Sequence, residues 1–329
     1  LVTMGAGTAQ GMERAALNGV SMLLSHYFET FYVLRPRVRS ERTRQFYRDE
    51  IAKLERCHGK PLLLEELSEP LVLRCCREQL KAGRSYATVQ KHQTAIRALW
   101  AYAYKKRNSI GINVADVPEF ERWPQLDREP ECWSIDELSK LISTAAMEGG
   151  FYGSTPAGLF WQTLLMTCYQ TGGRISAIMN ARWDDYDAAS GLLLLRAEDA
   201  KDKADTKAHL PPHLMQLLAQ LPREGDRIFD AWPRDRKSRS YTYTSLTRKF
   251  GRIIEASGLA CEPGERFHRL RRTFATYVAS KLGKSVAQTM LGHSSLKVTE
   301  RYLDKSKLDV PRACDVLPEP TIQGLRLCS

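Results

Sequence analysis

The sequence predicts a mostly α-helical protein of two domains, the second of which carries one small antiparallel sheet. The chain has 329 residues, roughly twice the usual length of about 150 for one domain. Apolar residues recur at helical spacing up to about residue 112, and short strand patterns occur only between about 181 and 210. Hydrophobic residues make up 43% and charged residues 26%, which excludes a disordered or fibrous chain.

The first domain, residues 20–112, is expected to hold three or four helices and no strand. Ser40 can cap a helix whose apolar positions follow at spacings of three and four: Phe46, Tyr47, Ile51 and Leu54. Ser68 before Glu69-Pro70 predicts a second helix start, and Gly83 is placed to end that helix. Ser85 begins a third helix that continues through Ala103.

The second domain, residues 133–310, follows a predicted linker over 113–132, which carries three prolines and no periodicity. Ser134 and Glu137 form a capping box, and an apolar helix covers Phe160–Tyr169. The expected strands are 181–186, 192–196 and 207–210, with a turn at 187–191 and a charged hairpin tip at 198–205. Helices are expected at 212–221, 244–257, 268–282, 284–291 and 295–303, and residues 311–329 form a tail.

The charge of the chain favours a polyanionic partner. Its formal net charge is +11 and its isoelectric point is about 9.3, so nucleic acid is the first candidate. One basic stretch in the first domain holds six arginines within fourteen residues: Arg35, Arg37, Arg39, Arg42, Arg44 and Arg48. A solvated helix face is the ordinary explanation of a charge run, but we favour a phosphate-contacting surface.

Other classes of protein are disfavoured. The eight cysteines contain no C-x-x-C pair, and no histidine cluster completes a metal site. We therefore expect no metal and reduced thiols in the cytoplasm. No apolar run is long enough for a membrane span, and the N-terminus lacks a signal-peptide pattern.

Four segments of the second domain carry side chains that could take part in catalysis. They place Arg174 after two glycines, Lys203 at the hairpin tip, His268 and Arg271 on one helix face, and Tyr302 nine residues after His293. Taken singly, each is more typical of ordinary structure: a surface arginine, a solvated lysine, a charged helix start and a packed tyrosine.

Taken together and in this order, the segments resemble the tyrosine recombinase (phage integrase) family. The matching text is TGGR, a lysine eight residues before Pro211, HRLRRTFAT, LGHSS and RYL, spread over about 130 residues. The resemblance implies a helical core-binding domain (SAM-like) followed by a catalytic domain of the DNA breaking-rejoining fold. It also implies a site-specific recombinase or integrase of a mobile element that uses no cofactor.

The family resemblance assigns each residue a role that the chemistry supports. Arg174 and Arg271 would clamp the scissile phosphate, and His293 would hydrogen-bond a phosphate oxygen. His268 would accept the proton of Tyr302, the nucleophile, while Lys203 would protonate the leaving 5′-oxygen. The product is a 3′-phosphotyrosyl link, and the chain has no ATP-binding G-x-x-x-x-G-K-[ST] loop.

The sequence departs from the family at two places. Ala177 stands where the family usually has an acidic residue, so that anchor is missing or supplied elsewhere, with Asp184 and Asp185 as candidates. The hairpin also contains Lys201 and Lys207, so the assignment of Lys203 depends on its distance from the proline.

The resemblance also implies partners: double-stranded DNA core sites, bound by a homotetramer on synapsed DNA and associated with the nucleoid. Apolar residues of the tail, Val316, Leu317, Ile322 and Leu327, would dock on a neighbouring protomer. Two alternatives remain open at this stage: a type IB topoisomerase-like enzyme that relaxes DNA, and a catalytically silent DNA-binding protein.

Overall fold

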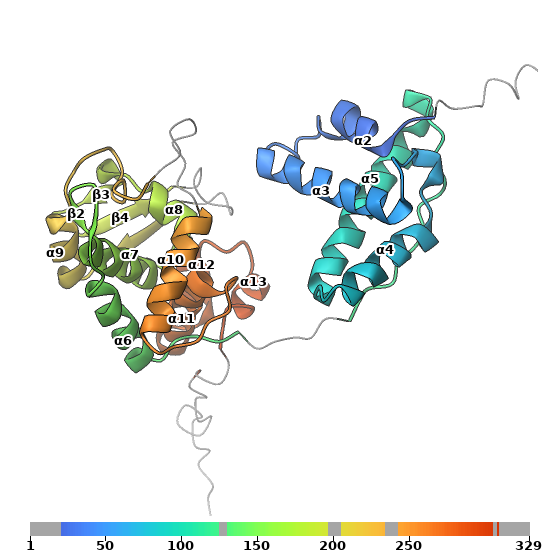
Figure 1. The fold of residues 1–329 in the computed structure, drawn as a ribbon. Helices are drawn as coiled ribbons and strands as arrows, with labels where there is room; N and C mark the ends of the chain where they lie inside the picture. The colour runs from blue at the N-terminus through green and yellow to red at the C-terminus, as the bar shows by residue number, and fades with distance from the viewer. Residues whose placement is uncertain (1–20, 125–129, 197–204, 234–242, 305–307, 309–329) are drawn as a thin grey trace, which may run out of the picture. The chain divides into compact units, whose positions relative to one another are not determined.

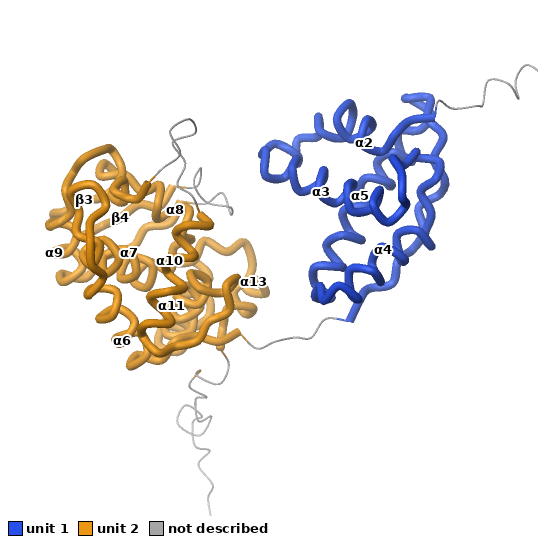
Figure 2. Tube along the Cα trace, viewed as in Figure 1, with its two compact units in different colours: residues 1–127 blue, residues 128–329 orange. Residues whose placement is uncertain are grey.

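The computed structural model describes residues 21–124, 130–196, 205–233, 243–304 and 308. The chain divides into two compact units, residues 1–127 and 128–329 (Figure 2). The described elements are mostly helices, with two small antiparallel sheets in the second unit. The predicted fold class is therefore confirmed.

Unit 1 is built from helices whose starts follow the predicted caps. The hydroxyl groups of Ser40 and Ser85 accept hydrogen bonds from the backbone N–H groups of Thr43 and Thr88, so both caps are confirmed. The helical elements are α2 (Leu24–Tyr27), a π-helical turn (Phe28–Tyr32), α3 (Glu41–His58), a 3₁₀ turn (Leu64–Glu66), α4 (Glu69–Lys81) and α5 (Tyr86–Ile110).

Much of the segment expected as a linker packs on unit 1. The indole N–H of Trp100 donates to the carbonyl of Ala115 at 2.8 Å. Trp123 stacks on Tyr86, with ring centroids 6.4 Å apart, and its backbone N–H donates to Gln90 at 2.9 Å. These contacts fix the segment to α5 as far as Trp123.

Unit 2 is organised around α7 (Ala157–Thr171), which packs against α6, α9 and α11 and against both small sheets (Figure 1). The capping box of Ser134 and Glu137 is present at the start of α6. The other helices are α6 (Ile135–Ala146), α8 (Ile175–Asn180), α9 (Pro212–Gln220), α10 (Tyr243–Ala256), α11 (Arg266–Leu282), α12 (Lys284–Leu291) and α13 (Leu296–Glu300).

The main sheet has the strand order β3-β4-β5, all antiparallel, and β4 faces β5 with Leu193 opposite Ala208. Its strands are β3 (Tyr186–Asp187), β4 (Leu192–Leu195) and β5 (Thr206–His209), and a separate hairpin joins β1 (Phe151–Tyr152) to β2 (Thr155–Pro156).

One predicted strand is wrong. Residues 181–186 do not form an extended strand, because Trp183–Asp185 is a 3₁₀ turn and only Tyr186–Asp187 enters the sheet. The buried carboxylate of Asp185 accepts from the backbone N–H of Arg182 and pairs with the guanidinium of Arg196 at 2.6 Å. These polar contacts close a turn where the apolar alternation indicated a strand.

A second, smaller core joins the last three helices of the described part. Phe274, Ala275 and Ala279 of α11 pack against Ala287 and Leu291 of α12. Leu303, which follows α13, completes this cluster, and Tyr302 packs against it. The end of the described part of unit 2 is thus held on α11.

Candidate active site

Gly172 brings the loop that carries Arg174 against α11. It ends α7 in the left-handed conformation with φ of 58°, a region that favours glycine. A Cβ atom at this position would lie only 2.3 Å from the Phe274 ring, so only glycine fits. Two residues later, Arg174 is the N-cap of α8, and its positive charge acts on His268 of α11.

Arg271 is buried, with 3% of its surface exposed, and its guanidinium lies at the C-terminal ends of two helices. One nitrogen, Nη1, donates to the carbonyl of Gly172 at 2.6 Å, and Nη2 donates to the carbonyl of Leu291 at 2.9 Å. These residues end α7 and α12. Because a helix C-terminus carries about half a negative charge, two helix ends stabilise this buried cation.

His293 and Tyr302 complete the cluster. Nη2 of Arg271 also lies 2.8 Å from Nε2 of His293, and Nδ1 of His293 lies 2.9 Å from Oγ1 of Thr299. The ring of Tyr302 is 4.9 Å from that of His293, centroid to centroid, and 5.5 Å from Cζ of Arg271. Residues from α11, from the loop after α12 and from the segment after α13 thus meet at one place.

His268 lies one helical turn before Arg271, and its ring centroid is 6.5 Å from that of Tyr302. Its pKa lies below the ordinary value, mainly because protein atoms displace water from the ring, although the residue still reaches solvent. Positive charge on Arg272, Arg271 and Arg174 lowers the pKa further, and Glu265 opposes the effect. A histidine with a lowered pKa is neutral near pH 7 and can accept a proton.

The acid missing at position 177 has no direct replacement at the predicted positions. Ala177 is buried in the main core, Asp184 is exposed, and Asp185 pairs with Arg196. Negative potential near Arg271 and His268 comes from the two helix ends on Arg271 and from the charge of Glu265.

The structure describes one of the three hairpin lysines. Lys201 and Lys203 lie outside the described residues. Lys207 is on β5 and is exposed. The assignment of Lys203 as proton donor therefore stays a prediction.

The chain next to Tyr302 is anchored by residues that the motifs did not reveal. The backbone N–H of Asp304 donates to Oγ1 of Thr276 on α11 at 3.1 Å. The carboxylate of Asp304 accepts from the backbone N–H of Cys132 at 3.3 Å. Thr299 and Asp304 lie three residues before and two after the tyrosine, and this proximity in sequence is the signal that could have found them.

The six arginines of the basic stretch over 35–48 fall into three groups. Glutamates pair with Arg44 and Arg48: Glu41 with both, and Glu29 with Arg48. Arg35 stacks over the rings of Tyr32 and Tyr102 at 4.8 and 4.5 Å. The other three, which we call the exposed arginines, have no ion pair within the described part of the chain: Arg37, Arg39 and Arg42.

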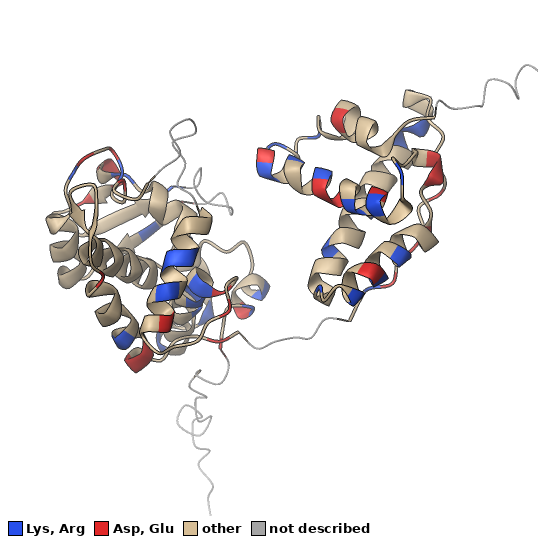
Figure 3. Ribbon diagram, in the orientation of Figure 1, with Lys and Arg blue, Asp and Glu red and all other residues tan. Residues whose placement is uncertain are grey.

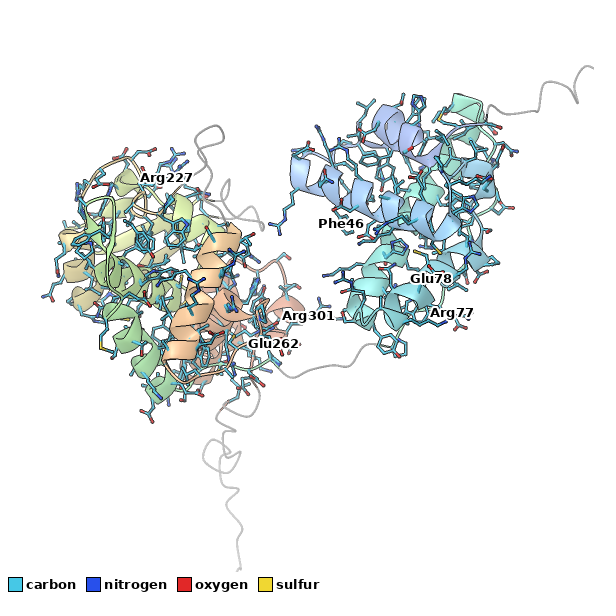
Figure 4. All side chains as sticks on the ribbon, viewed as in Figure 1. Phe46, Arg77, Glu78, Arg227, Glu262 and Arg301 are labelled. Carbon is cyan, nitrogen blue, oxygen red and sulfur yellow. The ribbon has the colours of Figure 1, made fainter. Side chains whose placement is uncertain are left out.

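Figure 3 shows acidic and basic positions side by side along α3, which contains Arg42 and follows Arg37 and Arg39. Phe46 on this helix is 37% exposed (Figure 4). In unit 2, Arg301, which precedes the candidate nucleophile Tyr302, is also exposed (Figure 4). A phosphate-contacting surface on unit 1 therefore depends on half of the predicted arginines.

Two further findings bear on the class of site. Among the described residues, no three or more His, Cys, Asp or Glu side chains are grouped so as to hold a metal ion. In the same part of the chain, no helix combines the length and apolarity needed to cross a membrane.

Comparison with known proteins identifies the family. Residues 134–308 match the model of the phage integrase family. Tyrosine recombinase XerC of Chlamydia caviae is 27% identical over 232 residues, which cover 68% of this chain and 70% of that protein. A putative tyrosine recombinase XerC of Pseudomonas aeruginosa is 23% identical over 80% of this chain and 65% of its own length.

Solved structures share the fold. A lambda integrase dimer bound to a COC′ core site has a TM-score of 0.67 and 20% identity, covering 94% of this chain and 84% of the integrase chain. The XerH site-specific recombinase bound to a palindromic difH substrate has a TM-score of 0.60 and 20% identity, covering 80% and 77%. The family match spans more than half of the chain, and the predicted resemblance is confirmed: the chain belongs to the phage integrase family of tyrosine-type site-specific recombinases.

Proposed function

We propose that this chain cuts and rejoins DNA at specific sites through a covalent 3′-phosphotyrosyl intermediate, with Tyr302 as the nucleophile. One observation carries the proposal. The Tyr302 ring lies 4.9 Å from the His293 ring and 5.5 Å from the guanidinium carbon of Arg271. The nucleophile and the phosphate-binding groups therefore belong to one site within one chain.

The chemistry assigns a task to each neighbour. The Tyr302 oxygen attacks phosphorus, an O–P bond forms, and the bond from phosphorus to the 5′-oxygen breaks. Arg174, Arg271 and His293 would stabilise the negative charge that develops on the phosphate oxygens. His268 would take the tyrosine proton, which suits its lowered pKa, and Lys203 would give a proton to the 5′-oxygen. Rejoining is the reverse reaction, so it needs neither ATP nor a metal.

The partners proposed for this chain follow from those of its structural neighbours. One neighbour is a lambda integrase dimer bound to a core site, and another is a lambda integrase tetramer bound to a Holliday junction. We infer that this protein binds double-stranded core sites as a homotetramer on synapsed DNA, in the cytoplasm at the nucleoid. The tail 311–329, which lies outside the described residues, would dock on a neighbouring protomer.

The alternative enzyme is a DNA-relaxing protein of the type IB topoisomerase kind, which shares the tyrosine chemistry. The relatives reported above are recombinases and integrases, which favours recombination. A silent DNA-binding protein is disfavoured because Arg174, Arg271 and Tyr302 are all present.

The test is capture of the covalent intermediate. Genomic fragments that carry nicks are incubated with the full chain, and DNA that stays attached to denatured protein is sequenced. Wild type should enrich one inverted-repeat core site, whereas Tyr302→Phe should bind DNA and form no adduct. Tyr243→Phe, an exposed tyrosine on α10, is the matched control and should behave as wild type. Adduct formation by Tyr302→Phe at the wild-type rate, or attachment without site preference, would contradict the proposal.

A further inference from the structure

Two hydrogen bonds define which nitrogen of His293 carries its proton. Nε2 lies 2.8 Å from Nη2 of Arg271, and a guanidinium can only donate. Nε2 is therefore the acceptor and has no hydrogen. A neutral imidazole then has its proton on Nδ1, which lies 2.9 Å from Oγ1 of Thr299 and donates to it.

This resting tautomer is the opposite of the one that phosphate chemistry requires. To donate to a phosphate oxygen, His293 needs an N–H on Nε2, the nitrogen that now accepts from Arg271. The ring can gain that proton in two ways. It can become a cation and keep Nδ1 as a donor, or it can change tautomer and turn Nδ1 into an acceptor.

Thr299 can serve His293 in both cases because a hydroxyl group donates one hydrogen bond and accepts two. Its side chain is fully buried, so no bulk water competes for Nδ1. The backbone of His293 is held separately, since Nε2 of Gln288 donates to its carbonyl at 3.2 Å. The hydroxyl of Thr299 therefore orients the imidazole ring of His293, whereas Gln288 holds the backbone of the loop.

We propose that Thr299 is a positioning residue for the His293 ring. It holds the ring while Nε2 changes from accepting a hydrogen bond from Arg271 to donating one to the scissile phosphate. This step rests on the proposed function. Thr299 belongs to α13 and lies three residues before Tyr302. The hydrogen bond between Thr299 and His293 therefore connects two parts of the site. One is α13, which leads to the nucleophile Tyr302, and the other is the group that binds the phosphate.

The first measurement needs no DNA, so it separates this inference from the proposed function. Nitrogen-15 spectra of the histidine rings are recorded on the full chain, and the signal lost in His293→Gln identifies His293 among the seven histidines. We expect a proton on Nδ1 in wild type and in Thr299→Ser. In Thr299→Val, Arg271 still donates to Nε2, so the proton should stay on Nδ1, but its signal should shift because that N–H has lost its acceptor. A wild-type spectrum with the proton on Nε2 overturns the inference whether or not any variant folds.

The second measurement is the rate of covalent attachment to a suicide duplex that carries the site recovered by capture. A buried N–H without an acceptor is costly enough to slow the reaction roughly 10- to 100-fold, so Thr299→Val should be slow and Thr299→Ser close to wild type. Thr289→Val, which removes a hydroxyl that donates to the carbonyl of Ser285 within α12, is the matched control. Equal rates for Thr299→Val and Thr289→Val overturn the inference.

Discussion

Replacing Arg271 by alanine should destabilise unit 2 as well as slow cleavage. The guanidinium donates to the carbonyls of Gly172 and Leu291, which end two helices. Hydrogen bonds to a charged group contribute about 1.5–3 kcal/mol each. Two such bonds give a loss of about 3–6 kcal/mol, a large part of a typical folding free energy of about 5–15 kcal/mol.

Hydrogen exchange of the α11 amides measures this loss, because a chain of two units has no single unfolding free energy. Arg252→Ala, which removes an exposed arginine from α10, is the control and should leave protection unchanged. Arg271→Lys should fall in between, since one ammonium keeps the charge at the helix ends but cannot occupy both Nη positions.

The same variants separate folding from catalysis. Loss of one preorganised donor costs about 10²–10³ in rate. Arg271→Ala and Arg271→Lys should therefore both lose far more of the cleavage rate than of the DNA affinity. If Arg271→Ala keeps its α11 protection within about 1 kcal/mol of wild type, the helix-end account of this arginine is wrong.

Three further predictions test the remaining groups. Alanine at all three exposed arginines should reduce the salt dependence of DNA binding by about 0.9 in log–log slope for each phosphate that is no longer neutralised, and an unchanged slope would refute their role. The lowered pKa of His268 keeps this base neutral, so the acid limb of the second-order rate of adduct formation should lie below about pH 6.5. Arg272→Gln removes a nearby positive charge, so it should move that limb to higher pH; an unmoved limb would exclude His268 as the base. A substrate with 5′-bridging sulfur should rescue Lys203→Ala, whereas rescue of Lys201→Ala would transfer the role of general acid.

The sequence by itself determined the features that depend on neighbouring residues. Hydroxyl caps at Ser40 and Ser134 and the positions of the long helices follow from contacts within a few residues, so the local pattern contains the necessary information. The order and spacing of Arg174, His268-x-x-Arg271, His293 and Tyr302 identified the family in the same way.

Only the tertiary structure decided how distant groups compensate one another. Arg271 meets the carbonyl of Gly172 across 99 residues, and no pattern in either segment states that the ends of two helices would meet at this guanidinium. Asp185 closes a turn because Arg196 reaches it across the sheet, which is why the strand over 181–186 was wrong. Side-chain charge is visible in a sequence, but its partners depend on the packing of whole elements.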